Sequence, residues 1–234
     1  MIKRIRLATG KGGLARDEFT RRWREAVAVS ASAPGPARPS RVTVSTALPD
    51  VVANQKYDGV ALEWFTDREH LLRFESWLLT PAGHASRLLM DEAVEPGTSP
   101  VVVTDERVVR GADWLERRWQ DGGPKTKQLA IATRARGLTL AQFLDLWRAR
   151  AGTIGATPIP DAYRGLAYTQ NHPRVTEGRD WAFDAINEVY FDDTDGLLAR
   201  IAYFERELSG DSENDLVSAN WFLAVREDLI QPGT

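Results

Sequence analysis

One helix-like stretch occurs twice in this chain, and the repeat constrains the fold more than any other feature. It reads GLARDEFTRRWREA at 13–26 and GLTLAQFLDLWRAR at 137–150. Four residues, Leu14, Phe19, Trp23 and Arg24, recur 124 positions later as Leu138, Phe143, Trp147 and Arg148. An internal repeat decides the architecture before any local prediction is made. Because 234 residues give room for two small domains, we expect two similar halves.

Each half is predicted to have the element order β-α-β-β-α-β, which is the ferredoxin-like plan. Segments with strand-like patterns lie at 3–9, 41–49, 57–67 and 100–109 in the first half, and at 127–133, 164–173, 183–193 and 215–225 in the second. The repeated helix follows the first strand of each half. Thr139 and Gln142 predict a capping box there, whereas the first copy has Ala15 at the cap. Thr66 and Glu69 predict a capping box for the next helix of the first half.

These elements divide the chain into residues 1–110, a connecting segment 111–126, and residues 127–234. The first half carries about ten extra residues around 80–97, which we expect to form a helix, and a Pro-rich loop at 30–40. In the connecting segment, Trp114 and Trp119 predict a short helix that lies on the body of the protein. A four-stranded sheet with two helices covers only one of its faces, and the other must be buried. We therefore expect an α+β fold in which two tandem ferredoxin-like repeats close into an intrachain pseudo-dimeric α+β barrel.

Several of these stretches resemble one known family. KRIRLATGKGGLARDEFTRRWRE is similar to the opening of the EthD family, YDGVALEWF resembles its Asp-Gly strand, and AYTQNHP resembles its Tyr-x-Gln-Asn-His strand. The resemblance covers nearly the whole chain as two tandem copies. It implies the dimeric α+β barrel fold, a superfamily of small oxygenases, isomerases and polyketide cyclases or dehydratases, many of which use no metal or organic cofactor. Many members carry a histidine four residues after the helix tryptophan, where this chain has Val27 and Ala151.

Composition excludes several classes of function. The net charge is −3, with acidic and basic residues interspersed, so we expect neither a nucleic-acid partner nor a membrane partner. There are no cysteines, which excludes thiolate chemistry and cysteine-ligated metals. Only three histidines occur, at 70, 84 and 172, and none stands at a ligand spacing, so we expect no metal and no cofactor. The N-terminus enters a strand-like pattern without an apolar leader, so we expect a cytoplasmic protein. The sequence leaves open whether the chain forms a homodimer.

Strand parity suggests which side chains line a pocket in the second half. If Leu129 and Ile131 face the helices, then Gln128 and Ala130 face the barrel interior. We expect the interior also to receive the alternating residues of the next two strands, which are Tyr168, Gln170 and His172, then Asp184, Ile186, Glu188 and Tyr190. A few polar groups converging between aromatic walls are typical of a ligand site. A single-residue bulge would reverse this assignment.

The matching face of the first half is more apolar. The same parity places Arg4 and Arg6, Val44 and Thr46, and Val60, Leu62 and Trp64 on it. Leu62 stands where the second half has Glu188, so we interpret the first half as a wall for a hydrophobic ligand and the second as the reactive half. Arg4 or Arg6 could meet a substrate carboxylate or enolate.

The leading hypothesis is a cofactor-independent enzyme that acts on a hydrophobic aromatic or polyketide-like small molecule. His172 or Glu188 would remove a proton, and Tyr168, Tyr190 or an arginine would stabilise the oxyanion, with Gln170 and Trp64 lining the site. The outcome would be dehydration, cyclisation or isomerisation, and oxygen insertion by a monooxygenase is the alternative. A third hypothesis is a non-catalytic binder or carrier of an apolar ligand. Each residue also has a structural interpretation: a rim position for His172, an ion pair for Glu188 and simple packing for the tyrosines.

Overall fold

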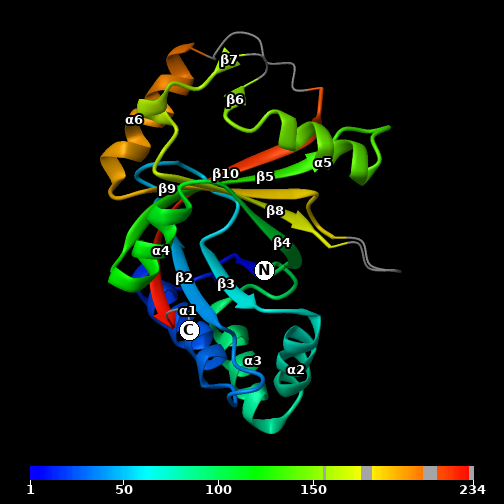
Figure 1. Cartoon of the computed structure of the whole chain (residues 1–234). Helices are drawn as coiled ribbons and strands as arrows, with labels where there is room; N and C mark the ends of the chain where they lie inside the picture. Colours follow the sequence, from blue (N-terminus) through cyan, green and yellow to red (C-terminus); the bar gives the residue numbers. More distant parts are fainter. Residues whose placement is uncertain (155–156, 175–180, 208–214, 232–234) are drawn as a thin grey trace.

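An eight-stranded antiparallel sheet closes on itself to form a barrel at the centre of the molecule (Figure 1). The computed structural model describes residues 1–154, 157–174, 181–207 and 215–231. The barrel strands are β1 (Ile2–Ala8), β2 (Arg41–Ala47), β3 (Gly59–Phe65), β4 (Val101–Arg110), β5 (Lys125–Arg134), β8 (Ala167–Pro173), β9 (Ala185–Phe191) and β10 (Val217–Gln231). All eight coincide with strands predicted from the sequence, so these predictions are confirmed.

The two halves of the chain contribute four neighbouring strands each. The closed order is β1-β3-β2-β10-β5-β9-β8-β4. In each half the fourth strand pairs with the first, the first with the third, and the third with the second. The halves meet where β2 pairs with β10 and where β4 pairs with β8. The sheet has no free edge, because closure satisfies both outer strands of each half.

Helices cover the outside of the barrel (Figure 1). The first half carries α1 (Arg16–Ala28), α2 (Arg68–Leu78) and α3 (Pro81–Ala93), and the second carries α5 (Leu140–Ala149) and α6 (Thr194–Glu207). Shorter pieces are the 3-10 turns η1 (Val29–Ser32) and η2 (Asp161–Tyr163) and the two-residue strands β6 (Thr153–Ile154) and β7 (Thr157–Pro158). Helix α3 confirms the predicted helix in the extra segment. Among the described residues, no helix is long and apolar enough to cross a membrane.

Helix starts follow the sequence signals with one exception. Thr139 and Gln142 form the predicted capping box at α5, and Ala15 leaves α1 without a side-chain cap. At α2 the prediction was wrong by one residue. Asp67, not Thr66, is the N-cap, and its carboxylate accepts a hydrogen bond of 2.8 Å from the backbone N–H of His70. Aspartate caps as well as threonine does, so the local sequence supported both starts.

An apolar core occupies much of the barrel interior. Its strand residues are Ile5, Leu7, Val60, Leu62, Trp64, Val102, Leu129, Ile131, Ala167, Ile186, Tyr190, Leu223 and Val225. Leu115 and Trp119 belong to the same core and come from α4 (Ala112–Asp121), the short helix predicted in the connecting segment. The ring of Trp119 lies edge-on to that of Trp64, with centroids 5.5 Å apart. Helix α4 therefore does more than lie on the surface, because it inserts side chains into the barrel.

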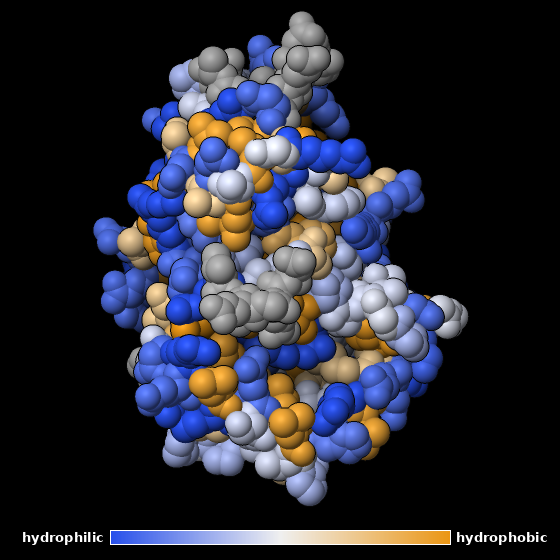
Figure 2. All heavy atoms as spheres, turned by 90° about the vertical axis from the view of Figure 1, so that its right-hand side faces the viewer, coloured by the Kyte–Doolittle hydropathy of each residue, from blue (hydrophilic) through white to orange (hydrophobic). Residues whose placement is uncertain are grey.

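Separate cores lie between the outside of the barrel and the helices. Phe19 and Trp23 of α1 pack on β2 and β3, and Phe143 of α5 packs on β5 and β9. Large hydrophobic residues that remain exposed are dispersed over the surface. On the face shown in Figure 2, outside the atoms drawn in grey, hydrophobic residues are interspersed with hydrophilic ones.

The predicted orientation of the first strand in each half was wrong. Leu129 and Ile131 point into the barrel, so Gln128 and Ala130 face the helices. The prediction assumed that the more apolar side of the strand packs on the helices. In a closed barrel the interior is itself a core, and β3 and β9 are buried on both faces. Apolar alternation therefore identifies a strand here without deciding which face is inside.

Candidate functional site

Tyr168, Gln170 and His172 form a hydrogen-bonded row on β8 that faces the helices. This corrects the predicted interior position of all three, which came from the same reversed parity. The Gln170 amide nitrogen lies 3.0 Å from the Tyr168 hydroxyl oxygen, and the Gln170 carbonyl oxygen lies 3.2 Å from Nε2 of His172. Gln170 is fully buried, whereas Tyr168 and His172 are partly exposed. The row therefore has a fixed centre and two accessible ends.

Helix α5 contacts this row directly, and α6 contacts strand β5 of the same half. The Gln170 amide also donates to the backbone carbonyl of Trp147, at 3.3 Å. The indole N–H of Trp147 donates to the Asn187 side-chain oxygen on β9, at 3.0 Å. Arg200 of α6 donates to the side-chain oxygen of Gln128 at 2.8 Å. These contacts join two helices and three strands around the polar row.

The hydrogen bonds decide the roles of the atoms in the row. Because the Trp147 carbonyl can only accept, the group that faces it is the Gln170 NH₂, and the opposite Gln170 oxygen must accept from His172. Nε2 of His172 therefore carries the proton, and the lone pair is on Nδ1. The Tyr168 oxygen accepts from Gln170, so its own O–H is left to donate elsewhere. The row thus offers one base and one donor.

Burial and neighbouring charges tune both ends of the row. Partial burial lowers the pKa of His172 below its usual 6.5, and the positive charges of Arg148 and Arg107 lower it further, against the opposing effect of Asp105. The imidazole is therefore neutral near pH 7. Burial raises the pKa of Tyr168 above 10, although the Gln170 hydrogen bond and Arg200 oppose the rise. A neutral imidazole and a protonated phenol are the forms required of a base and a hydrogen-bond donor.

Glu188 lies on the opposite face of the sheet, inside the barrel. Its carboxylate contacts the amines of Lys3 and Lys127 at 2.6 and 2.7 Å, and all three side chains are fully buried. Despite the burial, which favours protonation, the two lysines hold the pKa of Glu188 well below its usual 4.5. The predicted pairing of His172 with Glu188 as alternative bases at one pocket is wrong, because the sheet separates them. Glu188 is an ion-paired group of the core.

Tyr190 and Trp64 are in the interior, as their parity predicted, and both contact this ionic cluster. The Tyr190 hydroxyl donates to Glu188 at 2.8 Å, and the Trp64 indole donates to Glu106 at 2.9 Å. Burial and the nearby carboxylates raise the pKa of Tyr190 well above 10. Neither side chain is exposed to solvent, so neither has access to a ligand that binds outside the barrel.

Arg4 and Arg6 are on the outside of the first half, which again corrects their predicted interior position. Arg4 forms an ion pair with Glu63, and its guanidinium lies 5.7 Å from the ring of Phe74 on α2. Burial and the charge of Arg4 lower the pKa of Arg6 to about 10, against the effect of Glu63. Both arginines are on the other half of the molecule from the β8 row. Val44 and Thr46 likewise face outward: Val44 packs under α1.

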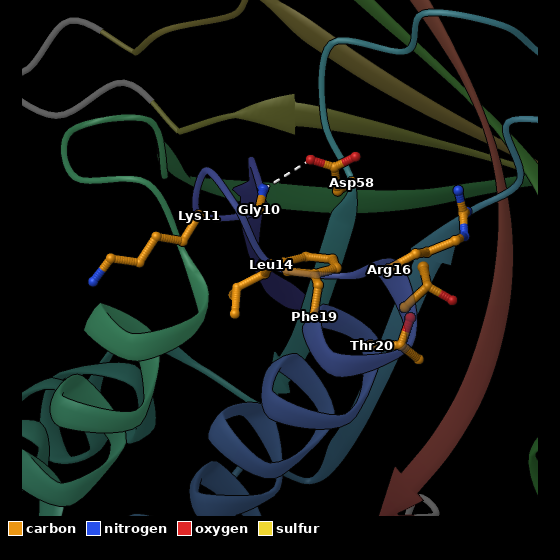
Figure 3. Close-up of a pocket in the computed structure, with 8 residues that line it drawn as sticks. Gly10, Lys11, Leu14, Arg16, Phe19, Thr20 and Asp58 are labelled. Atoms are coloured by element: carbon orange, nitrogen blue, oxygen red, sulfur yellow. Dashed lines mark hydrogen bonds between the residues drawn. The ribbon is translucent and has the colours of Figure 1, made fainter.

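A cavity of about 190 Å³ opens on the outside of the first half. It lies where β1 leads into α1, and its lining residues are Gly10, Lys11, Leu14, Arg16, Phe19, Thr20, Thr46 and Asp58 (Figure 3). One oxygen of Asp58 accepts from the backbone N–H of Gly10 at 2.7 Å. Leu14 and Phe19 supply an apolar wall, and Lys11 points away from it (Figure 3). The cavity has the size of a small ring compound and contains no histidine.

Some residues around the β8 row were missed or misjudged in the sequence. Trp147 was noted only as part of the repeated helix, Gln128 was assigned to the interior, and Asn187 and Arg200 were not singled out. Polar residues on otherwise apolar strands were the available signal for Gln128 and Asn187. The buried Lys3 and Lys127 were missed as well, although each stands in phase with apolar interior residues. Within the described residues, no three His, Cys, Asp or Glu side chains come together as a metal site.

Comparisons with known proteins identify the fold. No protein-family model matches the chain, and no curated protein matches it. Among solved structures, the chain is similar to an anthrone oxidase-like protein, with a TM-score of 0.61 and 12% identity over 98% of this chain and 93% of that one. It is similar to a "putative monooxygenase" of Fusobacterium nucleatum subsp. nucleatum, with a TM-score of 0.55 and 11% identity over 100% and 95% of the two chains.

A third similar structure is a "putative monooxygenase" of Lactobacillus acidophilus, with a TM-score of 0.52 and 10% identity over 99% of this chain and 96% of that one. At such identities the likeness concerns the fold alone. The mixed α/β architecture with its closed antiparallel barrel, aligned over whole chains with these proteins, is the dimeric α+β barrel fold.

Proposed function

We propose that the chain consists of two diverged EthD-like halves and is a small-molecule enzyme whose reaction centre is the outward face of β8. The supporting observation is the row of Tyr168, Gln170 and His172, with a neutral imidazole at one end and, at the other, a phenol O–H that donates to no residue in the described ranges. The substrate is a hydrophobic aromatic or polyketide-like molecule. The domain boundaries, the cytoplasmic location and any homodimer remain expectations from the sequence.

The reaction begins with proton transfer. Nδ1 of His172 takes a proton from a phenol or from a carbon next to a carbonyl group, and the O–H of Tyr168 donates to the oxyanion that develops. Gln170 positions both groups, since it bonds to each of them. Loss of water, ring closure or isomerisation of the resulting enolate needs only the proton held on His172. This chemistry requires no cofactor.

Oxygen insertion is the second candidate reaction. The first step is the same, because a deprotonated phenol or anthrone is electron-rich enough to react with molecular oxygen. The names of the similar structures, anthrone oxidase-like and "putative monooxygenase", favour this candidate. One atom of O2 is bonded to the ring carbon, and the other leaves as water with the two hydrogens of that carbon, so the product gains one oxygen and loses two hydrogens. Dehydration instead lowers the product mass by one water, and isomerisation leaves it unchanged.

A carrier function is the third candidate, and the cavity of the first half favours it. Leu14 and Phe19 could bind an apolar ring there without any catalytic group. In that case Leu14→Trp, which fills the cavity, abolishes ligand binding, and His172→Gln leaves binding intact.

The test is an assay of purified protein with phenols, anthrones, quinones and β-polyketones, followed by product mass and tryptophan fluorescence. We expect turnover by the wild type and a loss of at least about 100-fold in His172→Gln. His84→Gln is the matched control, because His84 is exposed on α3. Equal turnover by wild type and His172→Gln would refute the proposed centre. Fluorescence quenching without product across the panel would favour the carrier.

A further inference from the structure

Five charged side chains surround the His172 end of the row. They are Asp105 and Arg107 on β4, Asp145 and Arg148 on α5, and Arg174 just after β8. Four of them form two ion pairs: Arg174 contacts Asp105 at 2.6 Å, and Arg148 contacts Asp145 at 2.6 Å. The remaining one of these five side chains, Arg107, carries a positive charge that no carboxylate of this group balances.

The side chain of Arg107 is exposed and has no hydrogen-bond or ion-pair partner within the part of the chain that the structure describes. Its place next to the row follows from the strand register. Arg107 is directly opposite Gln170, and Asp105 is directly opposite His172, on the outward face of the β4–β8 pair. Side chains that are diagonal to each other across a strand pair are within reach when one of them is long. The guanidinium of Arg107 can therefore reach the space in front of His172.

Helix α5 delimits the same space from the other side. Gln170 bonds to the carbonyl of Trp147, so the last turn of α5 lies over the middle of the row. Arg148 is the next residue, and its side chain is partly exposed. Two guanidinium groups from two different elements thus flank one partly exposed imidazole, and only one of them is balanced by a carboxylate.

We propose that Arg107 anchors an anionic group of the substrate beside His172, so that the substrate class is narrowed to aromatic acids and phenolates. The proposal rests on the proposed function and specifies the ligand of the same site. Arginine suits this role because its planar fork donates two parallel hydrogen bonds to a carboxylate. An unpaired arginine next to a partly exposed imidazole is free to do so without breaking an existing ion pair.

The anchor also links ligand binding to the charge of His172. In the protein without ligand, partial burial and the nearby arginines lower the pKa of His172, and a bound anion cancels part of the effect of the arginines. By reciprocity, an anion that raises the pKa of His172 binds more tightly once His172 is protonated. Binding of an aromatic acid should therefore tighten as the pH falls below about 6.5, until the acid itself is protonated.

The test is an NMR titration with salicylate as the probe. The chain has only three histidines, so the Cε1–H signal of His172 is identified by its absence in His172→Gln. We expect salicylate to shift this signal and to raise the pKa of His172, whereas the uncharged salicylamide binds at least about tenfold more weakly. Arg107→Gln should weaken salicylate binding about tenfold, and should raise the pKa of His172 even without ligand. Arg68→Gln, at an exposed arginine on α2, is the matched control.

Three results would overturn the anchor: no response of His172 to salicylate, equal binding of salicylate and salicylamide, or equal behaviour of Arg107→Gln and Arg68→Gln. The anchor and the proposed function fail separately. Salicylate binding that depends on Arg107, without turnover of any compound, supports the anion site and counts against the enzyme. Turnover that depends on His172 but not on Arg107 or on the charge of the substrate supports the enzyme and rejects the anchor.

Discussion

Replacing Glu188 by leucine should destabilise the whole barrel. In the buried cluster, the cations Lys3, Lys127 and Arg118 form ion pairs with the carboxylates of Glu188, Glu106 and Glu227. Arg41 is a further, half-buried cation near Glu106 and Glu227. The first half has Leu62 at the matching position, so we expect the volume of leucine to be accepted. The substitution leaves the three ion-paired cations with two of their three carboxylates. Removing one member of a buried ion pair costs about 3–5 kcal/mol. The free energy of unfolding of an ordinary protein is ~5–15 kcal/mol, so this cost is a large part of it.

Urea unfolding followed by tryptophan fluorescence measures this effect, with Glu205→Leu on the exposed side of α6 as the control, expected to change stability by less than about 0.5 kcal/mol. The double variant Lys3→Met with Glu188→Leu also removes one of the two lysines that have lost the Glu188 carboxylate. We therefore expect it to be more stable than Glu188→Leu alone, which is a coupling that independent sites do not show. If Glu188→Leu costs under about 1 kcal/mol, or if the second substitution only adds to the loss, the charge balance is not what stabilises the barrel.

Three further outcomes follow from the same structure. The pKa of Glu188 is lowered from its usual 4.5, so the ionised Glu188 stabilises the folded protein fully above that pH and progressively less as the pH falls. The urea midpoint of the wild type should therefore drop more between about pH 5 and 3 than that of Glu188→Gln. Gly59→Ala would place a methyl group 2.7 Å from the indole nitrogen of Trp23. It should lower the free energy of unfolding in urea by about 1–3 kcal/mol and change the near-UV circular dichroism. No change in either measurement would refute the tight contact. Since the pKa of His172 is lowered, the acid limb of the rate profile should fall below pH 6.5, and a limb above that value would mean another base.

The positions of the strands could be predicted because local patterns decide them. Alternation placed all eight barrel strands, and the capping box at Thr139 placed the start of α5. The inward face of a strand could not be predicted in the same way. In β1 the outward set contains Arg4 and Arg6 and the inward set begins with Lys3, so charge occurs on both sides. Which charges are buried depends on partners such as Glu188, 185 positions away, and no local pattern reports such a partner.

The candidate site was predicted in its composition but not in its location. Tyr168, Gln170 and His172 do lie together, because a period of two keeps them on one face whichever way it points. Glu188 was predicted to lie on the same side of the sheet as this row. Alternation within one strand does not show which residues of the neighbouring strand point to the same side. In the structure the partners of Glu188 on β8 are Thr169 and Asn171, the residues between the members of the row.

This interleaving on β8 connects the core to the candidate site. Inward, Asn171 donates to the Glu188 carboxylate at 2.9 Å, and outward, its neighbours Gln170 and His172 bond to each other. The strand cannot slip by one residue without exposing the row to the barrel interior and Asn171 to the helices. The ionic cluster therefore fixes the register on which the row depends, and a site held by a rigid strand keeps its geometry better than one held by a loop. It follows that the cluster can be essential for activity although none of its members touches a ligand.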